Sequence, residues 1–324
     1  MRIVRHIKKA VRWYLDRSGW RLVRKDAYAG PVDHYRQVLI EGRAKPKEHK
    51  VDSIVFSKDR AMQLHAFLSS YIQMVSGRGT MYVLYRGSDE RHAQSYRELA
   101  AEFCGEDFVF VLETDFKAQL REISDQSAAS VIGLFVDDML FIRAVDYHRI
   151  LEFDLLKQVV TLSRGKDLEY SQVLKKHLTL PPFARAGDDF LSFKWNYADE
   201  YSDWTYPIGV SGYFFARDEW VVMLRSIDFK APNSLEGNLQ VYRPLFLDRE
   251  GVCPDQISCV CIHANLVQTE CVNPTLGTFS VEELLARWQD GLAIDLSFHR
   301  GSSGGEVQFK PYLFTERRKV TTSE

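Results

Sequence analysis

The sequence lacks several features of secreted and membrane-spanning proteins. It has only five cysteines among 324 residues, which is an odd number, and no apolar run long enough to cross a bilayer. Its first residues contain no apolar segment of the kind found at the centre of a secretory signal. We therefore expect a cytoplasmic protein that keeps its thiols reduced and has no disulfide framework.

An excess of charge of one sign is also missing from the chain as a whole. Lys and Arg number 42 and Asp and Glu number 44, so the formal net charge is −2. A nearly neutral chain has no general basic field for nucleic acid, and we predict no such partner. The composition, 45% hydrophobic and 27% charged, is typical of a globular protein with enough apolar residues for a large core.

The N-terminus departs from this balance. Residues 1–25 contain nine Lys or Arg and a single acid, and their apolar residues recur at helical spacing with two tryptophans among them. We predict a basic amphipathic helix over residues 1–27, followed by a linker over 28–50 that contains Gly30-Pro31 and a polar, Lys-rich stretch. Such a helix either lies on an anionic membrane surface, here the inner face of the cell membrane, or packs on the domain with its basic face in solvent.

From Val51 onward, strand patterns alternate with helical patterns, which predicts a parallel, doubly wound α/β sheet. The strict alternation ends near residue 140, and a mixed region rich in aromatic residues follows. We expect one folded domain over residues 51–300 and a loose tail over 301–324, because the tail begins with a Gly/Ser-rich stretch. The strands of the first half are expected at 51–57, 80–86, 108–113 and 131–136, with helices at 61–75, 89–103 and 116–123 between them.

Charged and hydroxyl-bearing residues follow three of the predicted strands, which places them at one edge of the predicted sheet. Ser57, Asp59 and Arg60 follow the first strand, Arg86 ends the second, and Asp137 and Asp138 end the fourth. Ligands of such sheets bind beyond the carboxyl ends of the strands, so we expect these groups to converge.

The two adjacent carboxylates repel each other unless a cation lies beside them. A divalent metal that carries a diphosphate would neutralise Asp137 and Asp138, whereas a turn or a helix cap explains the same dipeptide without a metal.

Four segments together resemble the GT-A class of nucleotide-sugar glycosyltransferases, and in particular bacterial transferases of cell-surface polysaccharide assembly. They are IVFSKDRAMQL (54–64), VDDM (136–139), YPIGVSGYFF (206–215) and PNSLEGNL (232–239). The resemblance implies a GT-A-like, Rossmann-type, mainly parallel sheet flanked by helices, with a nucleotide-binding half over 51–140 and a mixed acceptor half over 141–300. It also implies Mn²⁺ or Mg²⁺, a nucleotide-diphosphate sugar donor and a saccharide acceptor, which in this group is often lipid-linked. The Val-Asp-Asp sequence departs from the usual Asp-X-Asp motif.

The resemblance implies donor-binding roles for residues of the nucleotide half. Ser57, Asp59 and Arg60 would line the base and ribose, and Asp137 and Asp138 would bind the metal at the diphosphate. Arg86 is a further donor-binding candidate from its position at a strand end. A helix N-cap explains the segment from Ser57 to Arg60 equally well.

The acceptor half should supply a carboxylate base if the reaction inverts the sugar. Glu236 is the first candidate because it opens a short helix behind an aromatic segment, and Asp203 is the second. Glu236 is also explained as an acid that complements a helix dipole. Aromatic rings that would stack on the acceptor sugar, unless they belong to the core, are Trp204, Tyr206 and Tyr213.

His263 ends an apolar strand and is a candidate third metal ligand, as in many GT-A enzymes, with a buried core histidine as the alternative. Cys259 and Cys261 share its face of the strand, but their spacing is not that of a structural zinc site.

Two other functions fit a sheet of this kind. One is nucleotidyl transfer to a sugar phosphate, which usually needs a Gly-rich loop after the first strand, and SKDRAMQL has no glycine. The other is a non-catalytic module that binds a sugar or a nucleotide.

Overall fold

The computed structural model describes residues 25–44, 47–105, 107–171, 174–198, 200–262, 264–265, 267, 278–300 and 311–317, and the chain divides into two units, 1–44 and 45–324. The described part of the first unit is helix α2 (Lys25–Ala44). The prediction of a linker from residue 28 is therefore wrong as far as Ala44. His34, Val38 and Glu41 are buried and recur at helical spacing, and this periodicity outweighs the turn tendency of Gly30-Pro31. The predicted basic helix over 1–27 lies mostly outside the described residues.

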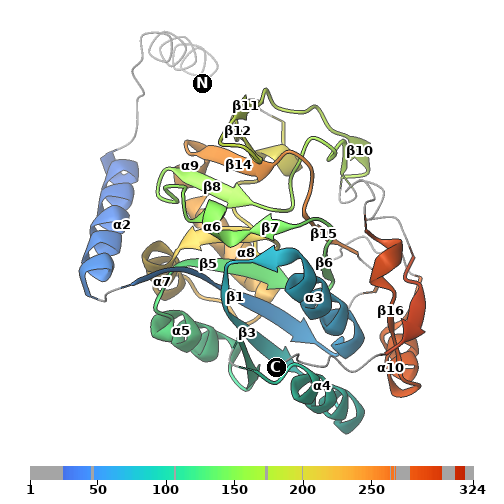
Figure 1. Cartoon of the computed structure of the whole chain (residues 1–324). Helices are drawn as coiled ribbons and strands as arrows, with labels where there is room; N and C mark the ends of the chain where they lie inside the picture. The colour runs from blue at the N-terminus through green and yellow to red at the C-terminus, as the bar shows by residue number, and fades with distance from the viewer. Residues whose placement is uncertain are drawn as a thin grey trace, which may run out of the picture. The chain divides into compact units, whose positions relative to one another are not determined.

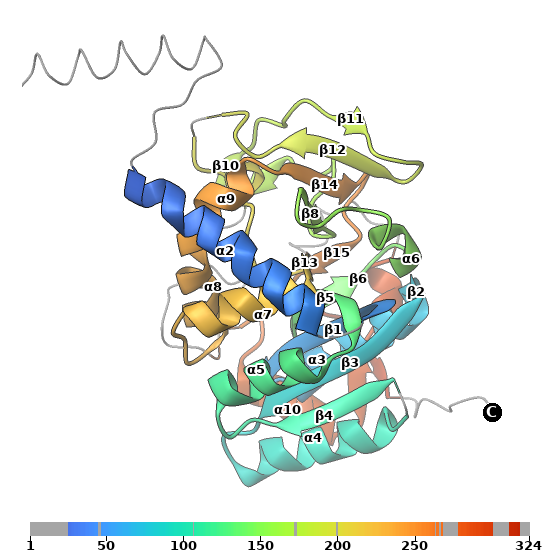
Figure 2. The same cartoon turned by 90° about the vertical axis from the view of Figure 1, so that its left-hand side faces the viewer.

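The second unit is built on a nine-stranded sheet with the order β11-β12-β14-β8-β13-β5-β1-β3-β4, which can be followed from top to bottom in Figure 2. Seven of the nine strands run in the same direction, and β12 and β13 run antiparallel to the strands beside them. The strands are β1 (Glu48–Lys58), β3 (Arg78–Arg86), β4 (Phe108–Leu112), β5 (Ala129–Val136), β8 (Gln158–Thr161), β11 (Ala184–Arg185), β12 (Phe190–Lys194), β13 (Tyr213–Ala216) and β14 (Glu250–Pro254).

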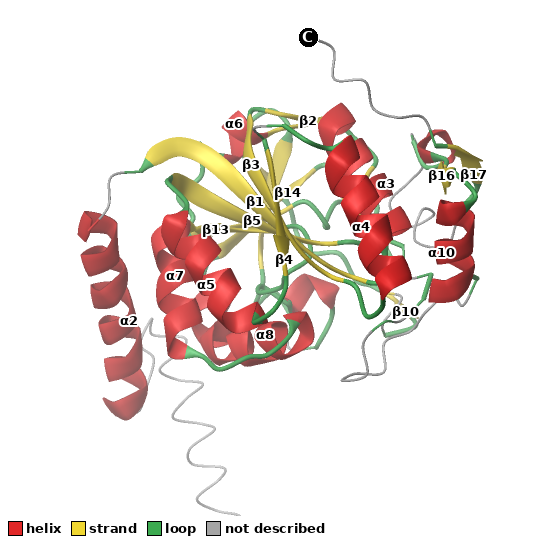
Figure 3. Cartoon of the chain, turned by 90° about the horizontal axis from the view of Figure 1, so that it is seen from below, coloured by secondary structure: helices red, strands yellow, loops and turns green. Residues whose placement is uncertain are grey.

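Helices cover both faces of this sheet. Figure 3 shows α5 (Phe116–Gln126) and α7 (Arg217–Ser226) on one side, and α3 (Ala61–Met74) and α4 (Glu90–Glu102) on the other. Because both faces are covered, the central strands β1 and β5 are buried along most of their length. The expected fold class, an α/β protein with a mainly parallel sheet and a mixed second half, is confirmed.

Smaller elements complete the second unit, and Figure 1 labels most of them. The helices are α6 (Tyr147–Ile150), α8 (Pro232–Leu239), α9 (Arg243–Leu247) and α10 (Val281–Gln289), with 3₁₀ turns η1 (Asp203–Thr205), η2 (Gln240–Tyr242) and η3 (Leu296–Phe298). The short strand pairs are β2 (Val75–Ser76) with β7 (Val145–Asp146), β6 (Met139–Phe141) with β15 (Cys259–Cys261), β9 (Tyr170–Ser171) with β10 (Lys176–His177), and β16 (Leu292–Ile294) with β17 (Phe314–Glu316). None of the helices in the described ranges is both long and apolar enough to cross a membrane.

The pairing of β17 with β16 corrects the prediction of a loose tail from residue 301. Residues 311–317 return to the domain, and the buried Tyr312 donates its hydroxyl hydrogen to the carbonyl oxygen of Ile262 over 3.1 Å. The Gly/Ser-rich stretch that suggested a tail is followed by apolar residues, Tyr312 and Phe314, that have a surface to pack against.

The strand order fixes the position of a ligand site. β1 lies between β3 and β5, so the chain leaves β1 in one direction to reach β3 and β4, and β5 pairs on the opposite side. A switch of this kind opens a crevice beyond the carboxyl ends of the two central strands. Ser57 and Asp137 lie at those two ends.

Candidate active site

A cleft of about 680 Å³ opens at the carboxyl edge of the sheet. The ends of β1, β3, β5 and β8 form one wall, and segments around 201–213 and 230–236 form another. Most of the predicted site residues line it: Ser57, Arg60, Arg86, Asp137, Asp138, Asp203, Tyr206, Tyr213 and Glu236. Asp59 and Trp204 are not among the lining residues, and His263 lies outside the described residues.

The turn between β1 and α3 directs Arg60 into the cleft. Asp59 has a left-handed backbone with φ of 56°, and its carboxylate accepts hydrogen bonds of 2.6 Å from the backbone N–H and the hydroxyl of Ser88. The hydroxyl of Tyr96 accepts from the backbone N–H of Arg60 and hydrogen-bonds the hydroxyl of Ser57. Asp59 therefore anchors the turn on the neighbouring β3–α4 connection, and Ser57 and Arg60 are the residues presented to the ligand.

The guanidinium of Arg60 bridges the carboxylate pair. Its Nη1 lies 3.0 Å from Asp137 Oδ1 and 3.1 Å from Asp138 Oδ2, and its Nε donates to Asn265 Oδ1. Burial lowers the pKa of Arg60, but the two carboxylates outweigh this effect and raise the pKa above its ordinary value. For Asp137, burial is the largest influence and raises the pKa, although Arg60 and the Ser57 hydroxyl oppose it. One positive charge thus meets two negative charges, and the group keeps a net negative charge when both carboxylates are ionised.

This residual charge fits a divalent cation. Magnesium in proteins is commonly held by one or two carboxylates together with phosphate oxygens of the substrate. Asp137 and Asp138 offer such a pair beside a cleft large enough for a nucleotide sugar. The phosphate oxygens would supply the ligands that the pair lacks.

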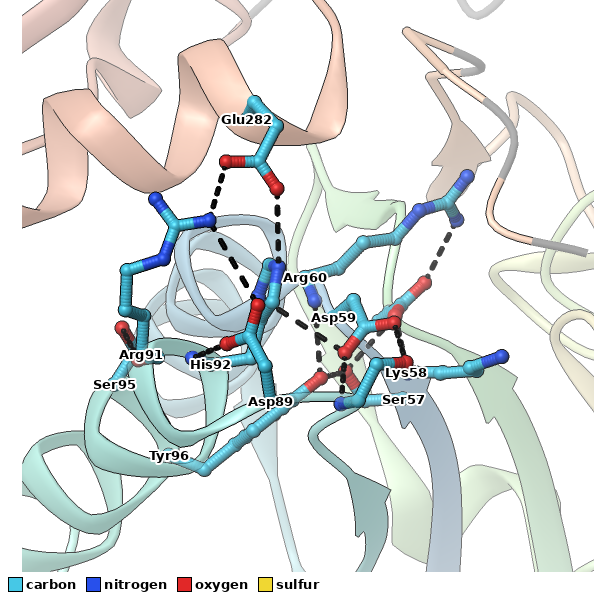
Figure 4. Close-up of polar contacts among 12 residues, drawn as sticks. Ser57, Lys58, Asp59, Arg60, Asp89, Arg91, His92, Ser95, Tyr96 and Glu282 are labelled. Atoms are coloured by element: carbon cyan, nitrogen blue, oxygen red, sulfur yellow. Dashed lines mark hydrogen bonds and ion pairs between the residues drawn. The ribbon is translucent and has the colours of Figure 1, made fainter.

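Three potential metal ligands also meet elsewhere, at Asp89, His92 and Glu282, whose ligand atoms lie within 4.8 Å of one another. Arg91 already lies against both of these carboxylates, at 2.7 Å from Glu282 and 3.7 Å from Asp89 (Figure 4). Asp89 also caps α4 by accepting from the backbone N–H of His92. The contacts of this cluster are those of a helix start docked on a neighbouring helix.

Glu236, on α8, is held by two donors. The hydroxyl of Tyr206 donates to Oε1 over 2.9 Å, and the backbone N–H of Val210 donates to Oε2 over 3.1 Å. Burial raises the pKa of Glu236, whereas both hydrogen bonds and the charge of Arg164 lower it. The carboxylate is therefore fixed in orientation and made more basic than an exposed glutamate, which suits a general base.

The other acceptor-side candidates differ in their surroundings. Asp203 lines the cleft, and its Oδ2 is buried without a hydrogen-bond partner among the described residues. Tyr213 donates its hydroxyl hydrogen to the backbone carbonyl oxygen of Tyr206, whereas the ring of Tyr206 packs edge-on against Tyr201. Trp204 is fully buried, packs edge-on against Phe193 and donates to a backbone carbonyl, which makes it a core residue.

The sequence interpretation missed three residues of the site. Tyr96 and Asn265 hold Arg60, but they come from α4 and from the segment after β15, and no local pattern connects them to the first strand. Arg164 follows β8 and lines the cleft. Arg164 follows an apolar strand, as Asp137 does, so the segment KQVVTLSRG (157–165) could have identified it by the same pattern.

Comparison with known proteins gives one similar sequence. The bifunctional glycosyltransferase pgtA from Dictyostelium discoideum is 26% identical over 181 residues, which is 50% of this chain and 23% of that protein. The chain thus spans about a quarter of the length of this relative. The resemblance to glycosyltransferases that the motifs indicate is confirmed by this similarity. No protein-family model matches the chain.

Two solved structures share parts of the architecture. A nucleotidyl transferase from Methanothermobacter thermautotroptrophicus has a TM-score of 0.37 and 13% identity, covering 64% of this chain and 89% of its own. The mannosyltransferase PcManGT from Pyrobaculum calidifontis, in complex with GDP-Man and Mn²⁺, has a TM-score of 0.29 and 13% identity, covering 43% of this chain and 46% of its own.

Proposed function

We propose that this chain transfers a sugar from a nucleotide-diphosphate sugar to a hydroxyl group of a saccharide acceptor, in the assembly of a surface polysaccharide. The observation that carries the proposal is a cleft lined both by the carboxylate pair Asp137–Asp138, at the sheet's switch point, and by the half-buried Glu236 on α8. The similarity to a bifunctional glycosyltransferase supports the reaction class. The four motifs that resemble bacterial transferases support the polysaccharide setting.

The donor would bind along the ends of β1, β3 and β5. Asp137 and Asp138 would hold Mn²⁺ or Mg²⁺, which when bound supplies positive charge to the leaving diphosphate. Arg60 keeps the two carboxylates in place, and Ser57 orients Asp137 through a hydrogen bond of 2.9 Å. Lys58 adds positive charge to the same part of the cleft, where Arg86 forms an ion pair of 3.6 Å with Glu113.

The acceptor hydroxyl would lose its proton to Glu236 as its oxygen attacks the anomeric carbon. The bond from that carbon to the phosphate oxygen breaks, and the nucleoside diphosphate leaves with the electron pair. The proton remains on Glu236, and Tyr206 and Val210 hold this carboxylate in one orientation during the transfer. Such a single displacement inverts the anomeric configuration of the sugar.

A donor panel tests the proposal. The full-length protein is incubated with a set of nucleotide sugars and Mn²⁺, with and without a chelator, and the nucleotide products are measured. We expect one donor to release its nucleoside diphosphate, and release to stop in the chelator. Release of pyrophosphate would show nucleotidyl transfer, and binding without turnover would show a non-catalytic module. Either result would overturn the proposal.

The basic segment at residues 1–25 supports a membrane-bound acceptor, because each Lys or Arg near an anionic leaflet contributes about 1 kcal/mol to binding. Deletion of residues 1–25 should abolish co-sedimentation with phosphatidylserine vesicles at low salt and leave donor turnover unchanged. If the shortened protein aggregates or loses turnover, the segment packs on the domain and the membrane proposal fails.

A further inference from the structure

Arg164 is a buried cation that no carboxylate of the described residues contacts directly, although the charges of Asp203 and Glu236 act on it from a greater distance. It follows β8, lines the cleft and is only 9% exposed. Its Nε donates to the carbonyl oxygen of Asp203, its Nη1 to the carbonyl and hydroxyl oxygens of Ser163, and its Nη2 to the hydroxyl of Tyr213, over 3.0 to 3.2 Å. All of these acceptors are neutral, and no carboxylate of the described residues forms an ion pair with its guanidinium. One of its five N–H groups is left without an acceptor in the described part of the chain.

The other buried arginines of the described residues differ from Arg164, because each of them contacts a carboxylate. Four arginines are buried among the described residues, and three of them contact a carboxylate. Arg60 contacts the pair described above, Arg217 lies 3.3 Å from Asp218, and Arg249 makes a two-pronged contact with Glu219 at 2.6 and 2.8 Å. Burying a charge without an ion pair costs free energy of folding. An arginine buried without a contacting carboxylate therefore indicates that it binds an anionic ligand.

The position of Arg164 separates it from the donor diphosphate. Strands β8 and β5 are not neighbours, because β13 lies between them. Two strand spacings separate these strands, so the backbone near Arg164 is offset by about 10 Å from the backbone near Asp137. Arg164 is instead joined to the predicted base: Tyr213 links it to the backbone of Tyr206, whose hydroxyl holds Glu236.

We propose that Arg164 forms an anion-binding subsite for the acceptor, which is therefore an acidic saccharide carrying a carboxylate or a phosphate group. Either group matches the fork of N–H donors that a guanidinium presents. The acceptor assignment rests on the proposed function, whereas the anion site itself does not. The hydroxyls of Ser163 and Tyr213 lie beside the guanidinium and complete the polar wall.

Inorganic phosphate is the first probe. We expect phosphate to bind the metal-free, full-length protein and to raise its melting temperature. Arg164→Gln should weaken phosphate binding by about 10–100-fold, the usual effect of losing charge-assisted hydrogen bonds, and Arg164→Lys should weaken it less. Asp138→Asn at the donor end should bind phosphate as well as the wild-type protein does.

Arg121→Gln is the matched control. Arg121 is partly buried and also donates only to carbonyl oxygens, those of Leu224, Arg225 and Ile227, but it does not line the cleft. Its replacement should leave phosphate binding unchanged. If Arg121→Gln weakens binding as much as Arg164→Gln does, or if Arg164→Gln has no effect, the subsite is overturned.

Competition against phosphate then identifies the group on the acceptor. Methyl glucuronide and glucose 6-phosphate should displace phosphate in the wild-type protein, and the stronger of the two shows whether a carboxylate or a phosphate is preferred. Methyl glucoside and glucose, which lack the charge, should not displace it, and equal displacement by the neutral sugars would refute an acidic acceptor. If no donor is turned over but phosphate binding still requires Arg164, the proposed function fails and the anion site stands.

Discussion

Arg60 and Arg164 line one cleft and are each 9% exposed, yet the groups that they contact differ in charge. Arg60 is bound to two carboxylates, and the group that it forms keeps a net negative charge. Arg164 contacts only neutral oxygens and keeps its positive charge. This difference supports the proposal that the two ends of the cleft bind different ligands, a cation with its diphosphate at one end and an anion at the other. Glu236 lies at the same end of the cleft as Arg164, to which Tyr206 and Tyr213 connect it.

The largest effect should come from replacing Glu236, the proposed base. Glu236→Gln keeps the size of the side chain and removes the base, so turnover should fall by about 10²–10⁴-fold. Donor affinity, measured by calorimetry, should stay near the wild-type value because Asp137 and Asp138 are untouched. Near wild-type turnover would remove Glu236 from the mechanism and make Asp203 the base.

Replacing each arginine by methionine tests whether Arg60 and Arg164 differ in their contribution to stability. Arg60→Met leaves two buried carboxylates without their cation, and the free energy of unfolding should fall by about 3–5 kcal/mol. Arg164→Met removes an unpaired buried charge, so its effect on stability should be much smaller or even favourable. Urea unfolding at pH 7 measures both, and equal losses would show that Arg164 is as structural as Arg60.

Asp138→Asn sharpens the description of the donor end. Loss of one carboxylate removes a metal ligand and leaves Arg60 paired with Asp137, so the fold should persist. Mn²⁺-dependent donor binding should weaken by about 100-fold, at the upper end of the range for removing a residue that supports a metal. Unchanged donor titrations in this variant and in Asp137→Asn would contradict the metal site.

The smallest effect concerns the pH dependence of the acceptor end. Turnover requires ionised Glu236, so kcat/KM should fall as the pH drops through its pKa, which burial raises above the ordinary value of 4.5. Tyr206→Phe removes a hydrogen-bond donor that stabilises the ionised carboxylate of Glu236, so the pKa of Glu236 should rise. The acidic limb of the profile of kcat/KM against pH should therefore move to higher pH by about 1–2 units. A limb that moves to lower pH, or that is unchanged, would show that Tyr206 does not act on the base.

Most residues of the proposed donor site could be predicted from local sequence patterns. β5 is a continuous apolar run because helices cover both faces of the sheet, and such a strand ending in two carboxylates is a strong local signal. Alternating strands and helices also predicted the parallel sheet and the shared edge that brings Ser57, Arg60 and Asp137 together. Glu236 was found in the same way, at a short helix behind an aromatic segment.

Tertiary structure decided the partners of these groups, because ion pairs and hydrogen bonds between distant segments leave no periodic trace in a sequence. Asp59 lies in the predicted donor motif but holds Ser88, and Trp204 lies in the acceptor motif but belongs to the core. The return of residues 311–317 to the domain likewise depends on a surface formed elsewhere in the chain. The sequence by itself determined which charged groups stand at the sheet edge, and only the folded chain decided that Arg60 is neutralised there and that Arg164 is not, since pairing depends on which carboxylates come within reach in three dimensions.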